Sequence, residues 1–270
     1  MKDYYGKSIA PLKDKKLFLF DMDGTIYIEH KLFDGVIELL QKIKEQGGRY
    51  AFISNNSSLS VADYIKKLAK MGIRASAGEF FTSAQAAAYV LKNKFQDKLI
   101  YAQGTRSFIA ELRRGGLRVT TLYTKKAHAI LVGYDSELNA KKIRTTCRML
   151  GQDLPYYAAN PDLVYPVSFG YVPDCGAMCK SYEYATGKKP VYIGKPEPTM
   201  IQVLMEKFGV DKKDTVVMGD RLYTDIKSGI NAGVDTVCVL SGEVKIEEVE
   251  KSDVHPTYVL GSVKEILKVF

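Results

Sequence analysis

The chain has 270 residues, of which 46% are hydrophobic and 26% are charged, and its formal net charge at pH 7 is +8. This length suits one or two domains, and the composition is that of an ordinary globular protein. The chain lacks the long apolar run that a membrane-spanning helix needs, and its N-terminus lacks the apolar core of a signal peptide, so we expect a cytoplasmic protein. The positive charge favours anionic ligands, phosphate esters included, although the basic residues are scattered rather than gathered in one block.

The N-terminal part of the chain predicts strands that alternate with helices. Four apolar residues at Leu17–Phe20 predict a short buried strand, and the apolar spacing within Gly35–Gln46 predicts a helix. Further strands are expected at Tyr50–Ile53 and Phe80–Thr82, with an amphipathic helix at Ser60–Met71 between them. This alternation is typical of a parallel sheet that is covered by helices.

The last third of the chain repeats the same pattern, and its first expected strand comes directly before a Gly-Lys-Pro sequence. The patterns predict strands at Pro190–Ile193, Thr215–Met218 and Thr236–Leu240, and helices at Thr199–Phe208, Asp225–Ala232 and Val263–Val269. We therefore expect the two ends of the chain to build one sheet.

The middle of the chain has strands and helices of its own but none of the aspartate clusters that mark both ends. Its expected elements lie at Lys98–Ala102, Ser107–Arg114, Ala129–Val132 and Ala140–Leu150. The simplest interpretation is an insertion. We predict an α/β protein whose Rossmann-like parallel-sheet core comprises residues 1–82 and 188–270, with an inserted α/β domain at 83–187.

Four short polar motifs each follow a predicted strand. They are DMDGT at Asp21–Thr25, SNNSS at Ser54–Ser58, GKP at Gly194–Pro196 and GDRLYTD at Gly219–Asp225. Because ligands of an open parallel sheet bind outside the carboxyl ends of its strands, we expect the four motifs to meet at one crevice. Taken alone, DMDGT also fits an acidic turn and SNNSS also fits a helix cap. The prediction of a ligand site therefore depends on their convergence.

The acidic residues of these motifs have the chemistry of phosphoryl transfer. Asp21 is a candidate nucleophile toward phosphorus, and Asp23, two residues later, is a candidate general acid and base. Asp220 and Asp225 add carboxylates from another strand end. Several acids around one point need a hard cation, and Mg2+ prefers oxygen ligands.

The other polar residues of the motifs are candidates for binding a phosphoryl group. Lys195 offers a positive charge to the phosphoryl oxygens and to Asp21. Ser54 offers a hydroxyl group, and together with Asn55 and Asn56 it offers backbone and amide donors for the remaining oxygens.

The four motifs, in this order and at these separations, resemble those of the haloacid-dehalogenase-like hydrolase (HAD) superfamily. The Ser-Asn-Asn motif, the GKP motif and the long insertion between them are similar to its class IIA branch, which includes 4-nitrophenylphosphatase-like and N-acetylglucosamine-phosphate phosphatase-like enzymes. The resemblance covers nearly the whole chain. It implies that the insertion is a C2-type cap domain that reads the leaving group of the substrate.

The resemblance also implies a role for each acidic residue. Asp21 would be the nucleophile and Asp23 the general acid and base. The metal ligands would be the Asp21 side chain, the Asp23 backbone carbonyl and Asp220, with Asp225 holding a metal-bound water.

For the phosphoryl group, the resemblance implies binding by Ser54 and Lys195 with help from Asn55 and Asn56. It further implies that the cap loop containing Tyr165 contacts the substrate.

The sequence thus predicts a Mg2+-dependent phosphatase of small phosphorylated metabolites that acts through an aspartyl-phosphate. The alternatives are a phosphotransferase of the same superfamily and a non-catalytic module that binds phosphate or metal. Net charge alone suggests a third alternative, a nucleic-acid-binding protein. We expect neither nucleic acid nor a membrane as a partner, and a homodimer is left open.

Overall fold

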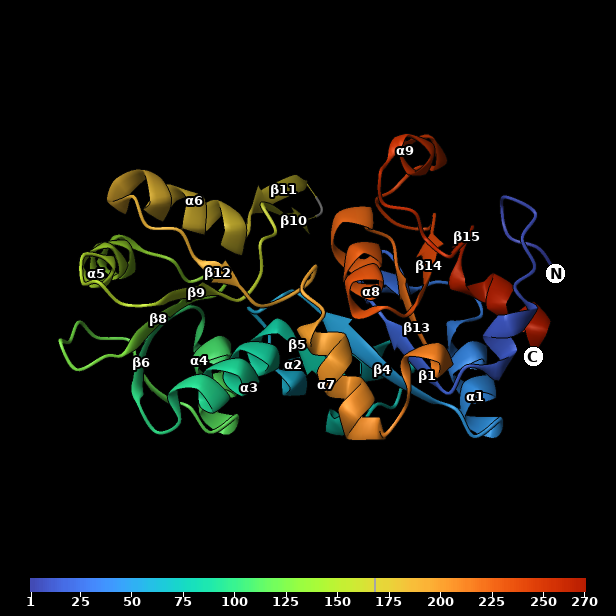
Figure 1. The fold of residues 1–270 in the computed structure, drawn as a ribbon, viewed down its shortest axis with the longest axis horizontal. Coiled ribbons are helices and arrows are strands. Elements are labelled where there is room, and N and C mark those ends of the chain that lie inside the picture. The colour runs from blue at the N-terminus through green and yellow to red at the C-terminus, as the bar shows by residue number, and fades with distance from the viewer. Residues whose placement is uncertain (168) are drawn as a thin grey trace. The chain divides into compact units, whose positions relative to one another are not determined.

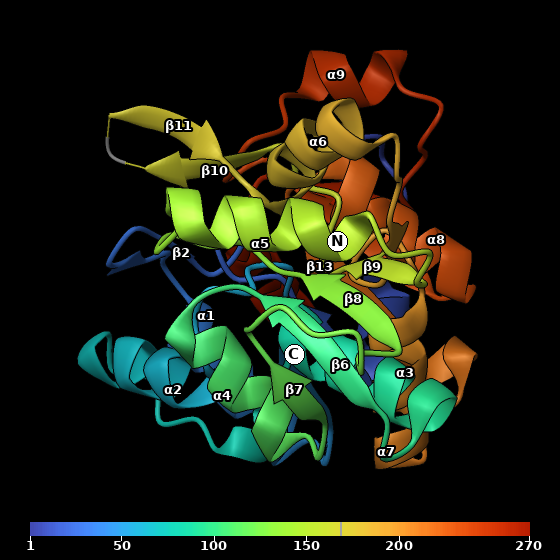
Figure 2. The ribbon, with the colours of Figure 1, turned by 90° about the vertical axis from the view of Figure 1, so that its left-hand side faces the viewer.

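The computed structural model describes residues 1–167 and 169–270, and within them it has a six-stranded sheet in one unit and a five-stranded sheet in another (Figures 1 and 2). Unit 1 comprises Met1–Ser54, Ile65–Phe81 and Lys195–Phe270. Unit 2 comprises Asn55–Tyr64 and Thr82–Gly194. The α/β fold class predicted from the sequence is confirmed.

The sheet of unit 1 has the strand order β15-β14-β13-β1-β4-β5. Strand β1 pairs in parallel with both β4 and β13, and β14 pairs in parallel with both β13 and β15. The bounds are β1 Leu17–Phe20, β4 Arg49–Ser54, β5 Phe80–Thr82, β13 Thr215–Gly219, β14 Asp235–Val239 and β15 Tyr258–Leu260.

Strand β1 is the place where the strand order reverses. The chain moves outward from β1 to β4 and β5 on one side, and it later builds β13, β14 and β15 on the other side. In open α/β sheets the ligand crevice lies at such a switch point, outside the carboxyl ends of the strands. All four side chains of β1 are buried, as expected for a strand that is covered on both faces.

The helices of unit 1 follow the predicted pattern with two differences of type. The region predicted as the helix Asp225–Ala232 begins as a π-helical turn, Leu222–Ile226, before it continues as α8, and Val263–Val269 is a 3₁₀ helix rather than an α-helix. The bounds are α1 Val36–Glu45, α2 Val61–Lys70 (which begins in unit 2), α7 Thr199–Phe208, α8 Lys227–Ala232 and α9 Ile246–Lys251, and a small hairpin is formed by β2 Tyr27–Ile28 and β3 Lys31–Leu32.

Unit 2 is built around strands in the order β12-β9-β8-β6-β7, which pair in parallel. Helices α3 and α4 cover one face of this sheet, and α5 and α6 cover the other (Figures 1 and 2). The bounds are β6 Leu99–Gln103, β7 Arg118–Thr120, β8 Ala129–Val132, β9 Tyr156–Ala158, β12 Val191–Tyr192, α3 Ser83–Phe95, α4 Arg106–Arg114, α5 Ala140–Leu150 and α6 Cys175–Thr186, with an antiparallel hairpin of β10 Val164–Val167 and β11 Gly170–Pro173.

One strand belongs to a different sheet from the one that was predicted. The strand expected at Pro190–Ile193 was grouped with the C-terminal part of the core, but β12 pairs with β9 in the sheet of unit 2. Strand β12 has only two residues, which is too short for a side-chain pattern that would indicate its sheet. Its place is decided by its pairing partner, which is distant in the sequence. None of the helices in the described part of the chain combines the length and the apolar character that crossing a bilayer requires.

Candidate active site

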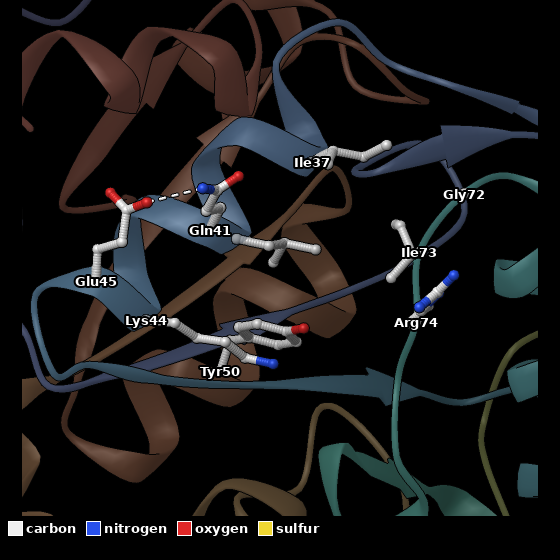
Figure 3. Close-up of a pocket in the computed structure, with 9 residues that line it drawn as sticks. Ile37, Gln41, Lys44, Glu45, Tyr50, Gly72, Ile73 and Arg74 are labelled. Atoms are coloured by element: carbon white, nitrogen blue, oxygen red, sulfur yellow. Dashed lines mark hydrogen bonds between the residues drawn. The ribbon is translucent and has the colours of Figure 1, made fainter.

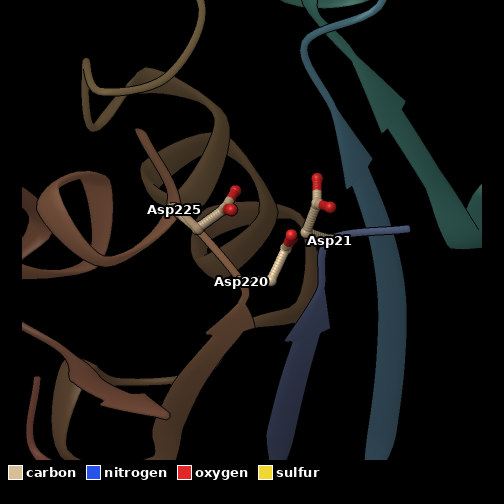
Figure 4. A group of neighbouring side chains, drawn as sticks. All are labelled: Asp21, Asp220 and Asp225. Atoms are coloured by element: carbon tan, nitrogen blue, oxygen red, sulfur yellow. The ribbon is translucent and has the colours of Figure 1, made fainter. Parts of the chain in front are cut away.

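Three carboxylates converge at the carboxyl end of the unit 1 sheet. Asp21 directly follows β1, and its backbone N–H donates to the carbonyl of Met218 at 2.8 Å, which extends the pairing with β13 by one residue. Asp220 directly follows β13, and Asp225 lies in the π-helical turn. Oxygens of Asp21, Asp220 and Asp225 lie within 4.8 Å of one another, and Figure 4 shows the three side chains pointing toward one another.

The ammonium group of Lys195 links two of these carboxylates. Its Nζ lies 2.6 Å from Oδ1 of Asp21 and 2.5 Å from Oδ1 of Asp225, and its side chain is only 2% exposed. The second oxygen of Asp225 accepts from the backbone N–H of Arg221 at 3.1 Å. Charge-assisted bonds of this kind are strong when they are shielded from water. With all three carboxylates ionised, they and the one ammonium group carry a net charge of two negative units, which one divalent cation balances.

Burial and mutual repulsion shift the ionisation of the cluster. Burial raises the pKa of Asp21 well above its ordinary value, the Asp225 carboxylate raises it further, and Lys195 opposes both effects. Burial, and then the charge of Asp225, raise the pKa of Asp220 to about 6. Burial alone would lower the pKa of Lys195, but Asp21 and Asp225 outweigh it and raise that pKa. The cluster therefore holds more negative charge than its surroundings stabilise, and its buried oxygen donors fit a hard cation such as Mg2+.

Three glycines allow these carboxylates to pack against the backbone. A Cβ atom at Gly24 or Gly242 would collide with the carboxylate of Asp220, and one at Gly219 would collide with Asp225. Gly24 also has a φ of +87°, a backbone conformation that residues other than glycine rarely adopt. The position of the Asp220 carboxylate thus depends on backbone that approaches it closely from two loops.

The loop after β14 completes the surroundings of Asp220, although it belongs to none of the four sequence motifs. The backbone N–H of Glu243 donates to Oδ2 of Asp220 at 2.7 Å, and the hydroxyl of Thr25 donates to Oδ1 at 3.3 Å. The hydroxyl of Ser241 donates to the carbonyl of Gly24 at 2.8 Å. A signal was present, because Ser241 and Gly242 directly follow a predicted strand, as the four recognised motifs do.

The side chain of Asp23 is held by a different pair of residues. The hydroxyl of Tyr27 donates to Oδ2 of Asp23 at 3.1 Å, and Nζ of Lys67 lies 3.5 Å from Oδ1. Lys67, on α2, also lies 4.0 Å above the ring of Tyr27. The Asp23 side chain is 33% exposed, so water can reach it, as a proton-transferring group requires. Nothing in the sequence singled out Lys67 or Tyr27 for this position.

The predicted phosphate-binding residues of the second motif differ in their surroundings. Ser54 is the buried last residue of β4, so it lies at the same edge of the sheet as Asp21. The side-chain nitrogen of Asn55 donates to Oδ2 of Asp162 at 3.1 Å. Oδ1 of Asn56 accepts from both the backbone N–H and the hydroxyl of Ser58, at 2.8 and 2.7 Å.

The alternative role of SNNSS as a helix cap is taken by another residue. The hydroxyl of Ser60 accepts the backbone N–H of Asp63 at 3.3 Å, and the carboxylate of Asp63 accepts the backbone N–H of Ser60 at 2.9 Å. This reciprocal pair caps α2. The helix therefore does not need the Ser54–Ser58 segment as its cap.

Tyr165 lies in unit 2, on β10 of the hairpin. Its ring centroid is 5.6 Å from that of Tyr134, and its side chain is partly buried. Its predicted contact with the substrate stays a prediction.

A separate cavity of unit 1 lies away from this cluster. It has a volume of about 340 Å³ and lies between α1 and the segment 72–74, over Tyr50 (Figure 3). Tyr50 is near the start of β4 and Ser54 is at its end, a separation of about 13 Å along the strand. The cavity is therefore distinct from the candidate active site.

Comparison with known proteins identifies the family. Residues 18–118 match the haloacid dehalogenase-like hydrolase model, and residues 192–266 match the HAD-hydrolase-like model. The acid sugar phosphatase of Staphylococcus saprophyticus is 31% identical over 257 residues, which cover 95% of this chain and 98% of the relative.

Solved structures agree with this assignment. The 4-nitrophenylphosphatase of Thermotoga maritima superposes with a TM-score of 0.90 at 34% identity, and the alignment covers 96% of this chain and 98% of that one. The glycerol phosphate phosphatase of Mycobacterium tuberculosis, solved in complex with magnesium, superposes with a TM-score of 0.89 at 25% identity and covers 95% of this chain and 77% of that one. The chain therefore belongs to the haloacid dehalogenase-like hydrolase family, in its class IIA branch.

Proposed function

We propose that this protein is a Mg2+-dependent phosphatase that hydrolyses small phosphorylated metabolites through an aspartyl-phosphate on Asp21. The names of its relatives, a sugar phosphatase and a 4-nitrophenylphosphatase among them, support a phosphomonoester substrate. The magnesium complex of the glycerol phosphate phosphatase supports the choice of metal.

The observation that carries the proposal is the position of Lys195 between Asp21 and Asp225. The ammonium group of Lys195 orients the buried carboxylate of Asp21 and favours its ionised form, which a nucleophile needs, against the burial that raises its pKa. The same ammonium group can bind the phosphoryl oxygens once the substrate arrives, and Ser54 lies at the same edge of the sheet to donate its hydroxyl. The backbone N–H groups of Asn55 and Asn56 would complete this phosphate site.

In the proposed mechanism, one carboxylate oxygen of Asp21 attacks phosphorus and the bond from phosphorus to the leaving oxygen breaks. Asp23 gives its proton to that leaving oxygen, so the alcohol departs neutral. Asp23 then takes a proton from water, which attacks the phosphorus of the aspartyl-phosphate and releases inorganic phosphate and free Asp21. The contacts of Asp23 with Tyr27 and Lys67 support this role because they fix the direction of its carboxyl group.

The metal would be held by the carboxylates of Asp21 and Asp220 and the backbone carbonyl of Asp23, with Asp225 alongside. When bound, Mg2+ supplies positive charge that neutralises the carboxylates and the phosphoryl oxygens. Asp225, through its bonds to Lys195 and to the backbone of Arg221, orients the ammonium group within this arrangement.

Hydrolysis of 4-nitrophenyl phosphate, with and without Mg2+, tests the proposal. We expect turnover that depends on Mg2+ and that falls about 10⁴-fold or more in Asp21→Asn, while the variant stays folded. Asp34→Asn, at a carboxylate that is 88% exposed, is the matched control and should keep full activity. Release of phosphate into water without an added alcohol separates a phosphatase from a phosphotransferase. A wild-type protein that shows no turnover in the presence of Mg2+ would contradict the proposed phosphatase.

A further inference from the structure

A closed ring of three hydrogen bonds joins Asn55, Asn160 and Asp162 inside unit 2. The side-chain nitrogen of Asn160 donates to the carbonyl of Asn55 at 2.7 Å, and the backbone N–H of Asp162 donates to Oδ1 of Asn160 at 3.0 Å. The side-chain nitrogen of Asn55 donates to Oδ2 of Asp162 at 3.1 Å, which closes the ring. All three residues are buried. The hydroxyl of Ser83 adds a bond to the same Asn55 carbonyl at 2.6 Å.

The residue before Asn160 holds a second segment in the same place. The backbone N–H of Gly194 donates to the carbonyl of Ala159 at 2.8 Å. A Cβ atom at Gly194 would lie 2.6 Å from that carbonyl oxygen and 2.6 Å from Oδ1 of Asn55. Glycine therefore permits the chain at 194 to lie directly against both Asn55 and Ala159. Two consecutive residues, Ala159 and Asn160, thus hold two segments that are far apart in the sequence.

Each of these two segments leads directly into a residue of the candidate active site. Ser54 precedes Asn55, and Lys195 follows Gly194. Consecutive Cα atoms are about 3.8 Å apart, so a residue whose neighbour is fixed can move little along the chain. Fixing Asn55 and Gly194 against each other therefore limits how far the backbones of Ser54 and Lys195 can separate.

We propose that Asn160 and Asp162 are positioning residues for the phosphate site, and that their ring with Asn55 sets the spacing between Ser54 and Lys195. This inference rests on the proposed phosphatase function. It assigns the Asn55 side chain to the ring, so that Asn55 serves the substrate through its backbone N–H and not through its amide group. A misplacement of about 1 Å at a reacting site costs about a hundredfold in rate, which is the scale of effect expected from opening the ring.

The decisive experiment exchanges the donor and the acceptor within the ring. Asn55→Asp places two carboxylates against each other and removes the bond to Asp162, so we expect kcat/KM for 4-nitrophenyl phosphate to fall by about a hundredfold. Competitive inhibition by inorganic phosphate should weaken with it. Adding Asp162→Asn restores a donor opposite the new acceptor. The kcat/KM of the double variant should therefore be at least about tenfold higher than that of Asn55→Asp alone.

Direct contact between the Asn55 side chain and the substrate predicts the opposite result. A carboxylate at position 55 would then repel the anionic substrate whatever residue stands at 162, so an absence of recovery in a folded double variant would overturn the proposal. Asn160→Asp offers a second route, because it keeps the acceptor for Asp162 and removes the donor to Asn55. Wild-type kcat/KM in folded Asn160→Asp would also overturn it.

A control variant separates loss of positioning from loss of stability. The hydroxyl of Tyr182 donates to Oε1 of Gln103 at 2.5 Å in the interior of the same unit. Tyr182→Phe removes this buried bond away from the ring, so it should lower the melting temperature and leave kcat/KM and phosphate inhibition unchanged. If the wild-type protein itself does not hydrolyse the ester, the proposed function fails. If it does and the Asn55→Asp protein matches it, the ring proposal alone fails.

Discussion

Lys195 and Asp21 are 174 positions apart in the chain, yet Nζ of Lys195 lies 2.6 Å from Oδ1 of Asp21. Both side chains are largely buried, with exposed fractions of 2% and 14%. Two ions removed from water in this way are stable only together, because an isolated buried charge carries a large desolvation cost. This pair links the first and third motifs of the candidate site.

Removing the ammonium group should therefore damage both stability and activity. In Lys195→Met, the carboxylates of Asp21 and Asp225 lose their shared partner, and breaking a buried pair in this way costs about 3–5 kcal/mol. We expect urea unfolding of the metal-free variant to show this loss at neutral pH, and a smaller loss in acid, where the carboxyl groups can protonate. The rate of hydrolysis should fall about 10²- to 10³-fold.

Lys16→Met is the matched control for this substitution. Lys16 pairs with Asp214 at 2.8 Å, but its side chain is 67% exposed, so water already solvates the charge. Its removal should change neither the unfolding midpoint nor the rate appreciably. A Lys195→Met protein as stable and as active as this control would contradict the charge arrangement.

The stability of the metal-free protein should fall as the pH rises through the range in which Asp220 ionises. Its pKa in the folded protein is about 6, above the ordinary value of 3.8, so between these values the folded state binds more protons than the unfolded state. Unfolding free energy falls with increasing pH under this condition. Mg2+ stabilises the ionised carboxylates, so its effect on the melting temperature should be greater at about pH 8 than at about pH 5.

Thermal melts at both pH values, with and without Mg2+, measure this effect. Asp220→Asn removes the titrating group and should weaken both the pH dependence and the stabilisation by Mg2+. Equal stabilisation by Mg2+ at the two pH values in the wild-type protein would be evidence against a metal held by these carboxylates.

The contact between Gly24 and Asp220 gives a prediction with an internal control. Gly24→Ala places a methyl group in the position of the Asp220 carboxylate, and it also strains a backbone with φ of +87°. Gly6 has a φ of +81°, and a methyl group added there would meet no atom within 4 Å beyond the two neighbouring residues of the chain, so Gly6→Ala carries the backbone strain alone. Both variants should lose stability by about 1 kcal/mol or more.

Kinetic measurements then separate the two effects. Gly24→Ala should raise the Mg2+ concentration needed for half-maximal activity, because Asp220 must move, whereas Gly6→Ala should leave it unchanged. The same Mg2+ requirement in both variants would show that the carboxylate does not depend on this contact.

The sequence by itself determined most of the local structure and which charged side chains meet at the candidate site. Leu17–Phe20, Phe80–Thr82 and Thr199–Phe208 form the predicted elements with the predicted bounds, because apolar spacing and turn residues are properties of neighbouring positions. The motifs at strand ends also indicated which side chains would meet, since parallel strands end at a common edge. Asp21, Asp220, Asp225 and Lys195 do lie together.

Only the tertiary structure decided the contacts between segments that no local pattern connects. The strand Tyr258–Leu260 was not predicted, and β12 joined the sheet of unit 2, because short strands are defined by their partners. The close approach of Gly242 to Asp220, and the ring formed by Asn55 with Asn160 and Asp162, likewise depend on where distant backbone lies. Donor and acceptor groups are present in many polar residues, and the fold alone selects which of them come within bonding distance.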